Sequence, residues 1–153
     1  MATEKLSRQL RGLQTGHVGL NVTDLERSKK FYQEVFGFKL LRESQEADYK
    51  FAFLGDGPMP VLTLFQQSQG HFEKGRPGLH HLSFQVDSIT QVKEAEQKLR
   101  SMSARFQYQG IVPHAEGATS GGIFFEDPDG IRLEIYVLTG ANVQAAPAGN
   151  APT

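Results

Sequence analysis

The sequence contains no cysteine. Without cysteine the chain has no disulfide framework, no thiolate ligand for a metal and no cysteine nucleophile. Any transition metal that it binds must therefore be held by histidine and carboxylate side chains.

Long apolar runs and a strong net charge are also missing. No stretch approaches the ~20 apolar residues that a membrane-spanning helix needs, and the formal net charge is -1. Nothing here favours a membrane or a nucleic acid held by charge. Residues 1–11 are polar and include Glu4, so we expect no secretory leader and a cytoplasmic protein. A chain of 153 residues predicts one domain, or two small half-domains that share a core.

An internal repeat is the most informative feature of the chain. Residues 17–22 (HVGLNV) align with residues 81–86 (HLSFQV), and both segments alternate apolar and polar residues as half-buried strands do. Each half then predicts a strand, a helix and three further strands. In the first half the predicted strands are 15–22, 38–42, 49–54 and 61–65, with a helix over 24–36 that begins at a Thr23–Glu26 capping box and ends at Gly37. In the second half the strands are 81–86, 105–109, 122–126 and 131–137, with a helix from residue 87 or 88.

This pattern predicts an α+β fold made of two paired βαβββ modules. The predicted divisions are an N-terminal arm (1–14), a first module (15–66), a linking loop (67–78), a second module (79–138) and a disordered tail (139–153).

The last predicted strand carries a carboxylate in its middle. It follows an Asp-Pro-Asp-Gly turn at 127–130, and its alternation places Arg132, Glu134 and Tyr136 on one face. A carboxylate is costly to bury unless it is paired or bound to a metal. We therefore treat Glu134 as a candidate metal ligand.

Two histidines occupy matched positions in the repeat. His17 and His81 begin the two aligned strands, on faces whose other residues are small or polar. A single histidine on a strand is usually a surface residue, but this register match favours a shared role. Together with Glu134 they provide the two imidazoles and one carboxylate of a facial triad, which suits Fe2+, Zn2+, Mn2+, Ni2+ or Co2+. His80 is the competing ligand, and strand parity favours His81.

Three further residues are candidates for catalysis. Arg132 and Tyr136 share the face of Glu134 and could orient a substrate, although Arg132 could equally be a solvated surface residue. His114 lies in a predicted loop, where solvation is the simpler interpretation, but it could reach a substrate.

Segments 16–32, 79–86 and 125–136 resemble the vicinal oxygen chelate superfamily. That group includes glyoxalases, extradiol ring-cleaving dioxygenases, fosfomycin-resistance proteins, methylmalonyl-CoA epimerases and bleomycin-type binding proteins. The resemblance covers about residues 15–138. It implies curled mixed sheets around a metal, with His17, His81 and Glu134 as ligands, and a homodimer whose metal sites are often shared between the chains.

The sequence departs from parts of that family pattern. Thr63 stands where glyoxalases and epimerases carry a fourth ligand, which implies three protein ligands plus water and argues against a true glyoxalase. Residue 124 is Phe where the extradiol pattern has Tyr, and His114 lies slightly too far upstream for that pattern.

The resemblance thus implies a divalent-metal-dependent enzyme acting on a small-molecule substrate. We expect it to be extradiol-dioxygenase-like, with Fe2+ or Mn2+ favoured and Zn2+ or Ni2+ as alternatives. The alternative functions are a fosfomycin-resistance-type thiol transferase, a glyoxalase-like lyase or isomerase, and a bleomycin-type resistance protein that only binds its small molecule.

Overall fold

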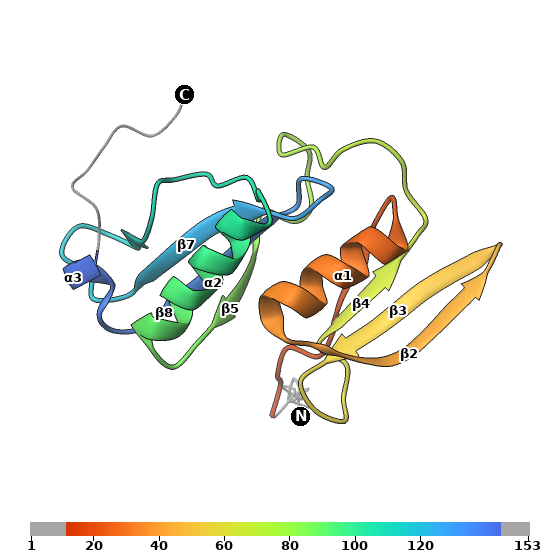
Figure 1. Cartoon of the computed structure of the whole chain (residues 1–153), viewed down its shortest axis with the longest axis horizontal. Helices are drawn as coiled ribbons and strands as arrows, with labels where there is room; N and C mark the ends of the chain where they lie inside the picture. Colours follow the sequence, from red (N-terminus) through yellow and green to blue (C-terminus); the bar gives the residue numbers. More distant parts are fainter. Residues whose placement is uncertain (1–11, 145–153) are drawn as a thin grey trace, which may run out of the picture.

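Two four-stranded mixed sheets, each covered by one helix, make up the chain in a computed structural model that describes residues 12–144 (Figure 1). The first sheet has the order β1-β4-β3-β2 and the second the order β5-β8-β7-β6. In chain order the elements are β1 (Val18–Asn21), α1 (Leu25–Phe36), β2 (Lys39–Glu46), β3 (Tyr49–Gly55), β4 (Leu62–Phe65), β5 (Leu82–Gln85), α2 (Ile89–Ser101), β6 (Val112–Pro113), β7 (Gly121–Glu126), β8 (Arg132–Val137) and α3 (Ala141–Gln144).

The two halves repeat one topology, as the sequence predicts. In each half the first strand pairs in parallel with the last (β1 with β4, β5 with β8), and the last pairs antiparallel with the strand before it. The register preserves the repeat, because Gly19 pairs with Thr63 and Ser83 pairs with Glu134. Thr63 therefore occupies in the first sheet the position that Glu134 occupies in the second.

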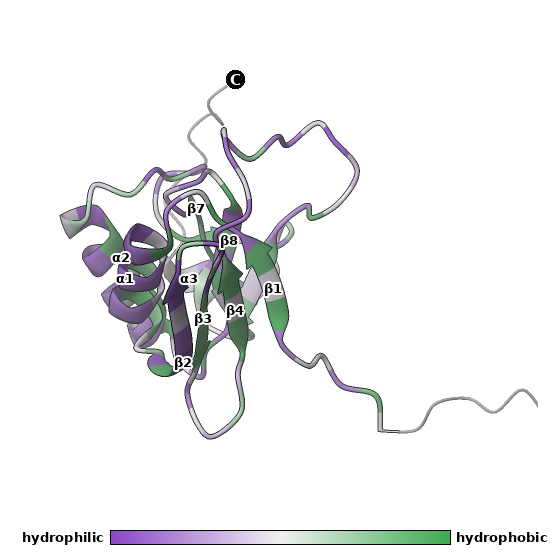
Figure 2. Cartoon of the chain, turned by 90° about the vertical axis from the view of Figure 1, so that its right-hand side faces the viewer, coloured by the Kyte–Doolittle hydropathy of each residue, from purple (hydrophilic) through white to green (hydrophobic). Residues whose placement is uncertain are grey.

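Helices α1 and α2 lie on the same side of the strands, so neither of them covers the other face of its sheet (Figure 2). The apolar faces of the strands pack under the helices, where Leu62 and Leu64 of β4 and Leu133 and Ile135 of β8 are buried. The alternation read from the sequence thus separates a core face from an outer face in each sheet.

Helix α1 also packs against the second half, so the two halves share one core. The Phe36 ring lies 4.6 Å from that of Phe84, and Phe31 lies 6.4 Å from Phe125, as ring centroids. The Tyr32 hydroxyl donates a buried 2.8 Å hydrogen bond to Oδ2 of Asp127. These contacts fasten α1 to the turn at 127–130.

The predicted start of the first helix is wrong by one residue. Asp24 is the N-cap, and its carboxylate accepts a 3.0 Å hydrogen bond from the backbone N–H of Arg27. The Thr23 hydroxyl and backbone N–H instead donate to Asp129 in the second half. Because a tertiary partner takes Thr23, the next polar residue caps the helix. The predicted cap at Gly37 is confirmed, with φ of 69° and a bond to the Gln33 carbonyl.

The predicted strand at 105–109 is not formed. Phe106 makes only an isolated bridge with Phe125, and Gly110 then turns the chain with φ of 69° toward the two-residue strand β6. Within the predicted tail the structure has the short helix α3, whose Ala141 is buried. Residues 1–11 of the predicted arm and 145–153 of the tail lie outside the described part. No helix within residues 12–144 has the length and apolar character to traverse a bilayer.

Candidate metal site and adjoining pocket

The outer face of the second sheet carries the candidate site. Strand β8 presents Arg132, Glu134 and Tyr136 on this face, as predicted from the alternation, and buries the residues between them. Phe124 of β7 pairs with Glu134 from the other side. The Glu134 side chain is only 6% exposed, so its charge needs partners close by.

Each carboxylate oxygen of Glu134 faces a histidine. Nε2 of His114 lies 2.5 Å from Oε1, and Nε2 of His81 lies 3.4 Å from Oε2. The His114 ring is held from behind, because its Nδ1 lies 3.0 Å from Oγ of Ser120. Tyr136 flanks it with ring centroids 5.2 Å apart. The prediction that Arg132, Tyr136 and His114 act in catalysis is untested, but His114 and Tyr136 lie together beside Glu134.

The contact between His114 and Glu134 is one that sequence reasoning did not find. It depends on the pairing of β6 with β7 and on a turn in which the backbone N–H of His114 donates to the Ser120 carbonyl over 2.9 Å. The glycines in residues 115–122 are the signal for a tight reversal that could have placed His114 opposite β8.

His81, rather than its neighbour His80, is the histidine that faces Glu134. The two rings contact each other through their Nδ1 atoms at 2.8 Å, which leaves Nε2 of His81 for the carboxylate. This arrangement agrees with the parity argument for His81, and both histidines line the adjoining pocket.

The predicted triad is not brought together within one chain. His17 directly precedes β1 in the first sheet and is exposed, whereas His81 and Glu134 belong to the second sheet. Across residues 12–144, no three His, Cys, Asp or Glu side chains are placed to hold one metal ion. Thr63 is buried and lies 3.5 Å from the Val18 carbonyl oxygen.

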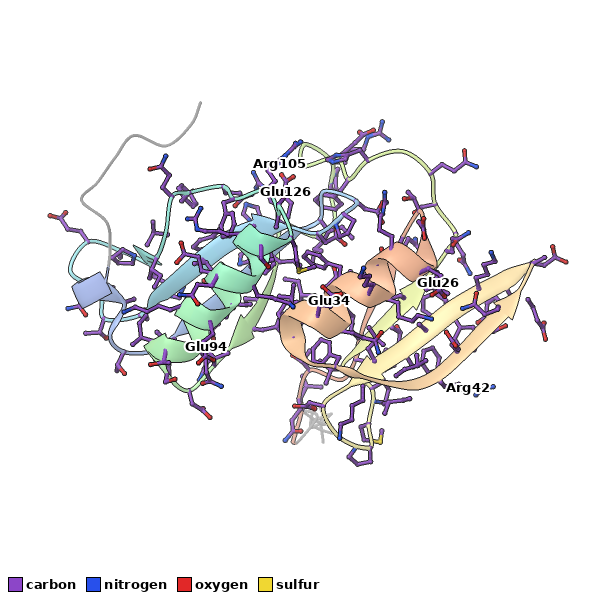
Figure 3. All side chains as sticks on the ribbon, in the orientation of Figure 1. Glu26, Glu34, Arg42, Glu94, Arg105 and Glu126 are labelled. Atoms are coloured by element: carbon purple, nitrogen blue, oxygen red, sulfur yellow. The ribbon has the colours of Figure 1, made fainter. Side chains whose placement is uncertain are left out.

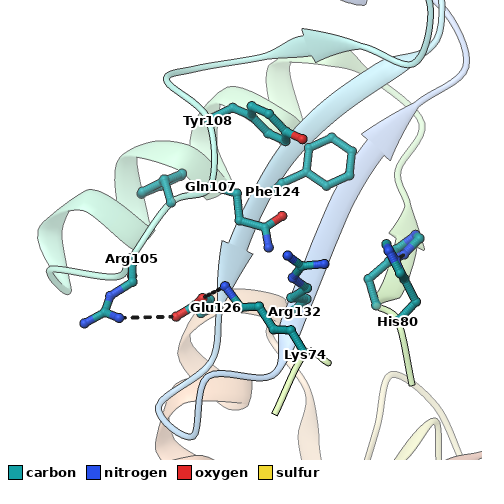
Figure 4. A pocket seen from close by; sticks show the side chains of 10 residues that line it. Lys74, His80, Arg105, Gln107, Tyr108, Phe124, Glu126 and Arg132 are labelled. Carbon is teal, nitrogen blue, oxygen red and sulfur yellow. Dashed lines mark hydrogen bonds and ion pairs between the residues drawn. The ribbon is translucent and has the colours of Figure 1, made fainter. Parts of the chain in front are cut away.

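A pocket of about 580 Å³ adjoins the pair formed by His81 and Glu134 (Figure 4). Its lining combines aromatic, cationic and histidine side chains with one amide and one carboxylate: Lys74, His80, His81, Arg105, Phe106, Gln107, Tyr108, Phe124, Glu126 and Arg132. Arg105 and Glu126 lie beside each other next to the linking loop (Figure 3). The volume is in the range of small-molecule sites.

The donor atoms available here suit a borderline divalent ion. Imidazole nitrogen and carboxylate oxygen are the ligand types that such ions take in the absence of thiolate. His81 and Glu134 supply one of each, so the second sheet provides two candidate ligands.

Residues 14–135 match the model of the Glyoxalase/Bleomycin resistance protein/Dioxygenase superfamily. The chain belongs to this superfamily. Lactoylglutathione lyase from Escherichia coli O157:H7 is 35% identical over 129 residues, which span 78% of this chain and 88% of that protein. The lactoylglutathione lyase of Haemophilus influenzae is 34% identical over 132 residues, spanning 80% of this chain and 90% of its own.

Solved structures of superfamily members share the fold. A glyoxylase/bleomycin resistance protein/dioxygenase domain from Frankia sp. EAN1pec superimposes with a TM-score of 0.69 at 28% identity, covering 82% of this chain and 97% of that one. The fosfomycin resistance protein FosX of Listeria monocytogenes, in a complex with Mn(II), gives a TM-score of 0.65 at 20% identity, covering 86% and 95%. At that identity the second likeness concerns the fold alone.

Proposed function

We propose that this superfamily member is a divalent-metal-dependent lyase or isomerase of the glyoxalase type, acting on a small molecule with two neighbouring oxygens. The observation that carries the proposal is the buried carboxylate of Glu134 beside His81, at the edge of a pocket of about 580 Å³. The curated relatives at 34–35% identity are lactoylglutathione lyases. They favour a lyase over the extradiol dioxygenase that the sequence led us to expect.

A homodimer with shared metal sites is part of this proposal. His81 and Glu134 of one chain would hold the metal together with His17 of a second copy, since no third ligand joins them within residues 12–144. The outer face of the first sheet supports such a contact. It carries an aromatic cluster in which the Phe51 ring lies 4.9 Å from Phe53 and 6.3 Å from Phe65, while Gly19 and Asn21 on the same face are exposed.

The metal, when bound, would supply Lewis acidity to the two neighbouring oxygens of the substrate. The chain supplies orientation. Ser120 fixes the His114 ring, and His114 in turn fixes Oε1 of Glu134. The Tyr136 hydroxyl donates to Oε1 of Gln85 over 3.0 Å, which orients the phenol beside His114.

Metal content and lyase activity of the full-length protein test the proposal. We expect about one divalent ion per chain and turnover of the hemithioacetal of methylglyoxal with glutathione or another small thiol. The Glu134→Ala variant should lose both metal and turnover with an unchanged circular dichroism spectrum. The matched control is Glu116→Ala, which removes an exposed carboxylate and should change neither.

Three results would contradict this function. Full metal stoichiometry in Glu134→Ala would remove Glu134 from the ligands. Oxygen consumption with catechols, without lyase activity, would favour the extradiol dioxygenase that the sequence led us to expect. Small-molecule binding that is equally tight after metal removal would indicate a bleomycin-type binding protein.

A further inference from the structure

The pocket beside Glu134 contains more positive than negative charge. Lys74, Arg105 and Arg132 line it, and Glu126 is the one carboxylate among its lining residues. Glu126 is 6% exposed and pairs with Lys74 at 2.8 Å and with Arg105 at 3.9 Å. The register places Arg132 directly across from Glu126 on the neighbouring strand, yet the ion pairs of this carboxylate are made with the other two cations (Figure 4).

Arg132 has a hydrogen-bond donor that no residue within 12–144 satisfies. Its Nε is buried without a partner within the described residues, and so is Nε2 of Gln107, which lines the same pocket. In Figure 4 the Gln107 amide and the Arg132 guanidinium point toward each other. A buried donor without an acceptor costs free energy. These donors border a pocket whose lining is mainly cationic, which suits a ligand group with several acceptor oxygens.

The separation between Arg132 and the candidate metal site follows from the positions of Arg132 and Glu134 on β8. Arg132 and Glu134 are two residues apart on the same face of β8, so their Cα atoms are about 7 Å apart. Phe124 pairs with Glu134 and contacts the Tyr108 ring edge-on at 5.5 Å. The space between the two anchor points is therefore bordered by aromatic rings.

We infer that Arg132 and Gln107 form a subsite for an anionic group of the substrate, a carboxylate or a phosphonate, and that this subsite lies next to the candidate metal site, because the Cα atoms of Arg132 and Glu134 are about 7 Å apart on β8. The inference rests on the proposed function and narrows its substrate class. The substrate then carries an acidic group in addition to its two neighbouring oxygens.

Three matched compounds test the subsite by calorimetric titration of the full-length protein loaded with Mn2+. Catechol supplies two neighbouring oxygens alone, 3,4-dihydroxybenzoate adds a carboxylate across the ring, and 3,4-dihydroxyphenylphosphonate adds a phosphonate at the same place. We expect at least one acid to bind about 10–100-fold more tightly than catechol, as a charge-assisted hydrogen bond supplies. The acid with the larger gain in affinity over catechol shows whether the subsite prefers a carboxylate or a phosphonate.

Variants of Arg132 and Arg105 show which of the two pocket arginines is responsible for the tighter binding of the acid. Arg132→Met keeps the length of the side chain and should reduce the preference for the acid to below about threefold, and Arg132→Lys should restore part of it. Arg105→Met is the control, because its guanidinium lines the same pocket but is 77% exposed and lies near Glu126. It should keep most of the preference.

The outcomes separate this inference from the proposed function. Binding of catechol with no gain from either acid, or a gain that survives in Arg132→Met, overturns the subsite and leaves the metal site intact. Failure to take up Mn2+ or any other of the divalent ions named above overturns the proposed function. The same acids are then titrated against the metal-free protein, where binding that depends on Arg132 supports the subsite and absence of such binding overturns it.

Discussion

Nε2 of His114 lies 2.5 Å from Oε1 of Glu134, while Nδ1 of the same ring lies 3.0 Å from Oγ of Ser120. The histidine therefore connects a loop hydroxyl to the buried carboxylate of β8. The neutral tautomer that satisfies both contacts has its proton on Nε2 and accepts from Ser120 on Nδ1. This fixes one oxygen of Glu134 and leaves Oε2 on the side of His81.

Removing this ring should weaken metal binding more than it weakens the fold. Contacts behind a metal ligand typically contribute 10–100-fold to affinity, so we expect a loss of about that size in His114→Leu. The His114 side chain is about one-third exposed, so the unfolding transition should move little. Competition with a fluorescent chelator gives the affinity. The Ser120→Ala variant removes only the hydroxyl that supports the His114 ring, so it should lose less metal affinity than His114→Leu. Equal affinity in all three proteins would leave His114 without a role at the metal.

Mixing two inactive variants tests the shared site. His17→Ala and Glu134→Ala should each lose metal when purified alone. If each site takes His17 from one chain and Glu134 from the other, a heterodimer of the two variants contains one intact site. Random exchange of subunits should then restore about a quarter of the wild-type metal content. The control is the double variant mixed with itself. A site within one chain predicts no recovery in any mixture.

The sequence is sufficient to predict the repeat, the elements of the first module and the face on which Glu134 lies. All of these follow from local patterns: the matched HxGxNx and HxSxQx segments, the turn at 127–130, and the alternation of residues 131–137. The equivalence of Thr63 with Glu134 follows from the same repeat and is confirmed by the strand register.

Contacts between distant segments could not be predicted in this way. The start of α1 shifts to Asp24 because Thr23 binds Asp129, more than a hundred residues later in the chain. His114 reaches Glu134 only through β6, a strand of two residues that carries no periodic signal. In the proposed homodimer the third metal ligand comes from a second copy, and no local pattern encodes such an assembly.

Asp127 should make the stability of the chain depend on pH. Burial raises the pKa of its carboxyl from 3.8 to about 6, against the hydrogen bonds from Tyr32 and from the backbone N–H groups of Ile131 and Asp129. The folded chain therefore binds this proton more tightly than the unfolded chain does. The contribution of Asp127 to the free energy of unfolding is fully present below about pH 4, declines as the pH rises to about 6, and is constant above that.

The Asp127→Asn variant has no titrating carboxyl at this position, and its side chain has nearly the same shape as that of aspartate. Relative to wild type, the variant should gain about 3 kcal/mol between about pH 4 and pH 7. Urea unfolding of both proteins at several pH values gives the difference, from which the common titrations cancel. Asp56→Asn, at an exposed turn position, is the control and should give a flat difference. A flat difference for Asp127→Asn would place its folded pKa near the ordinary value.

The hydroxyl of Tyr32 should be worth more than an ordinary surface hydrogen bond. It donates to Asp127 in the core shared by the two halves, and the pKa of this phenol is raised well above its usual value by burial and by the carboxylate. Tyr32→Phe leaves a buried carboxylate oxygen without its donor, which should cost about 2 kcal/mol of unfolding free energy near neutral pH. In the Asp127→Asn background the same change should cost less. Equal costs in both backgrounds would show that the hydroxyl acts independently of Asp127.

Gly130 should tolerate alanine less well than another glycine with a similar backbone. Gly130 and Gly110 have φ of 83° and 69°, so alanine pays about 1 kcal/mol of left-handed strain at either position. A Cβ on Gly130 would also overlap the ring of His71, whereas nothing lies within 4 Å of a Cβ on Gly110. His71 belongs to the linking loop, which is held to the turn by a 2.8 Å bond from the Phe72 N–H to the Asp129 carbonyl.

The extra cost at Gly130 should disappear when the ring is removed. We expect Gly130→Ala to lower the unfolding free energy by about 1 kcal/mol more than Gly110→Ala. In a His71→Ala background the two glycine variants should become equal, because only the shared backbone strain is left. Thermal unfolding is measured for wild type and His71→Ala, each alone and combined with Gly130→Ala or Gly110→Ala, and these six proteins complete the cycle. A surplus that persists without His71 would mean that the turn itself, and not the docked loop, requires glycine at position 130.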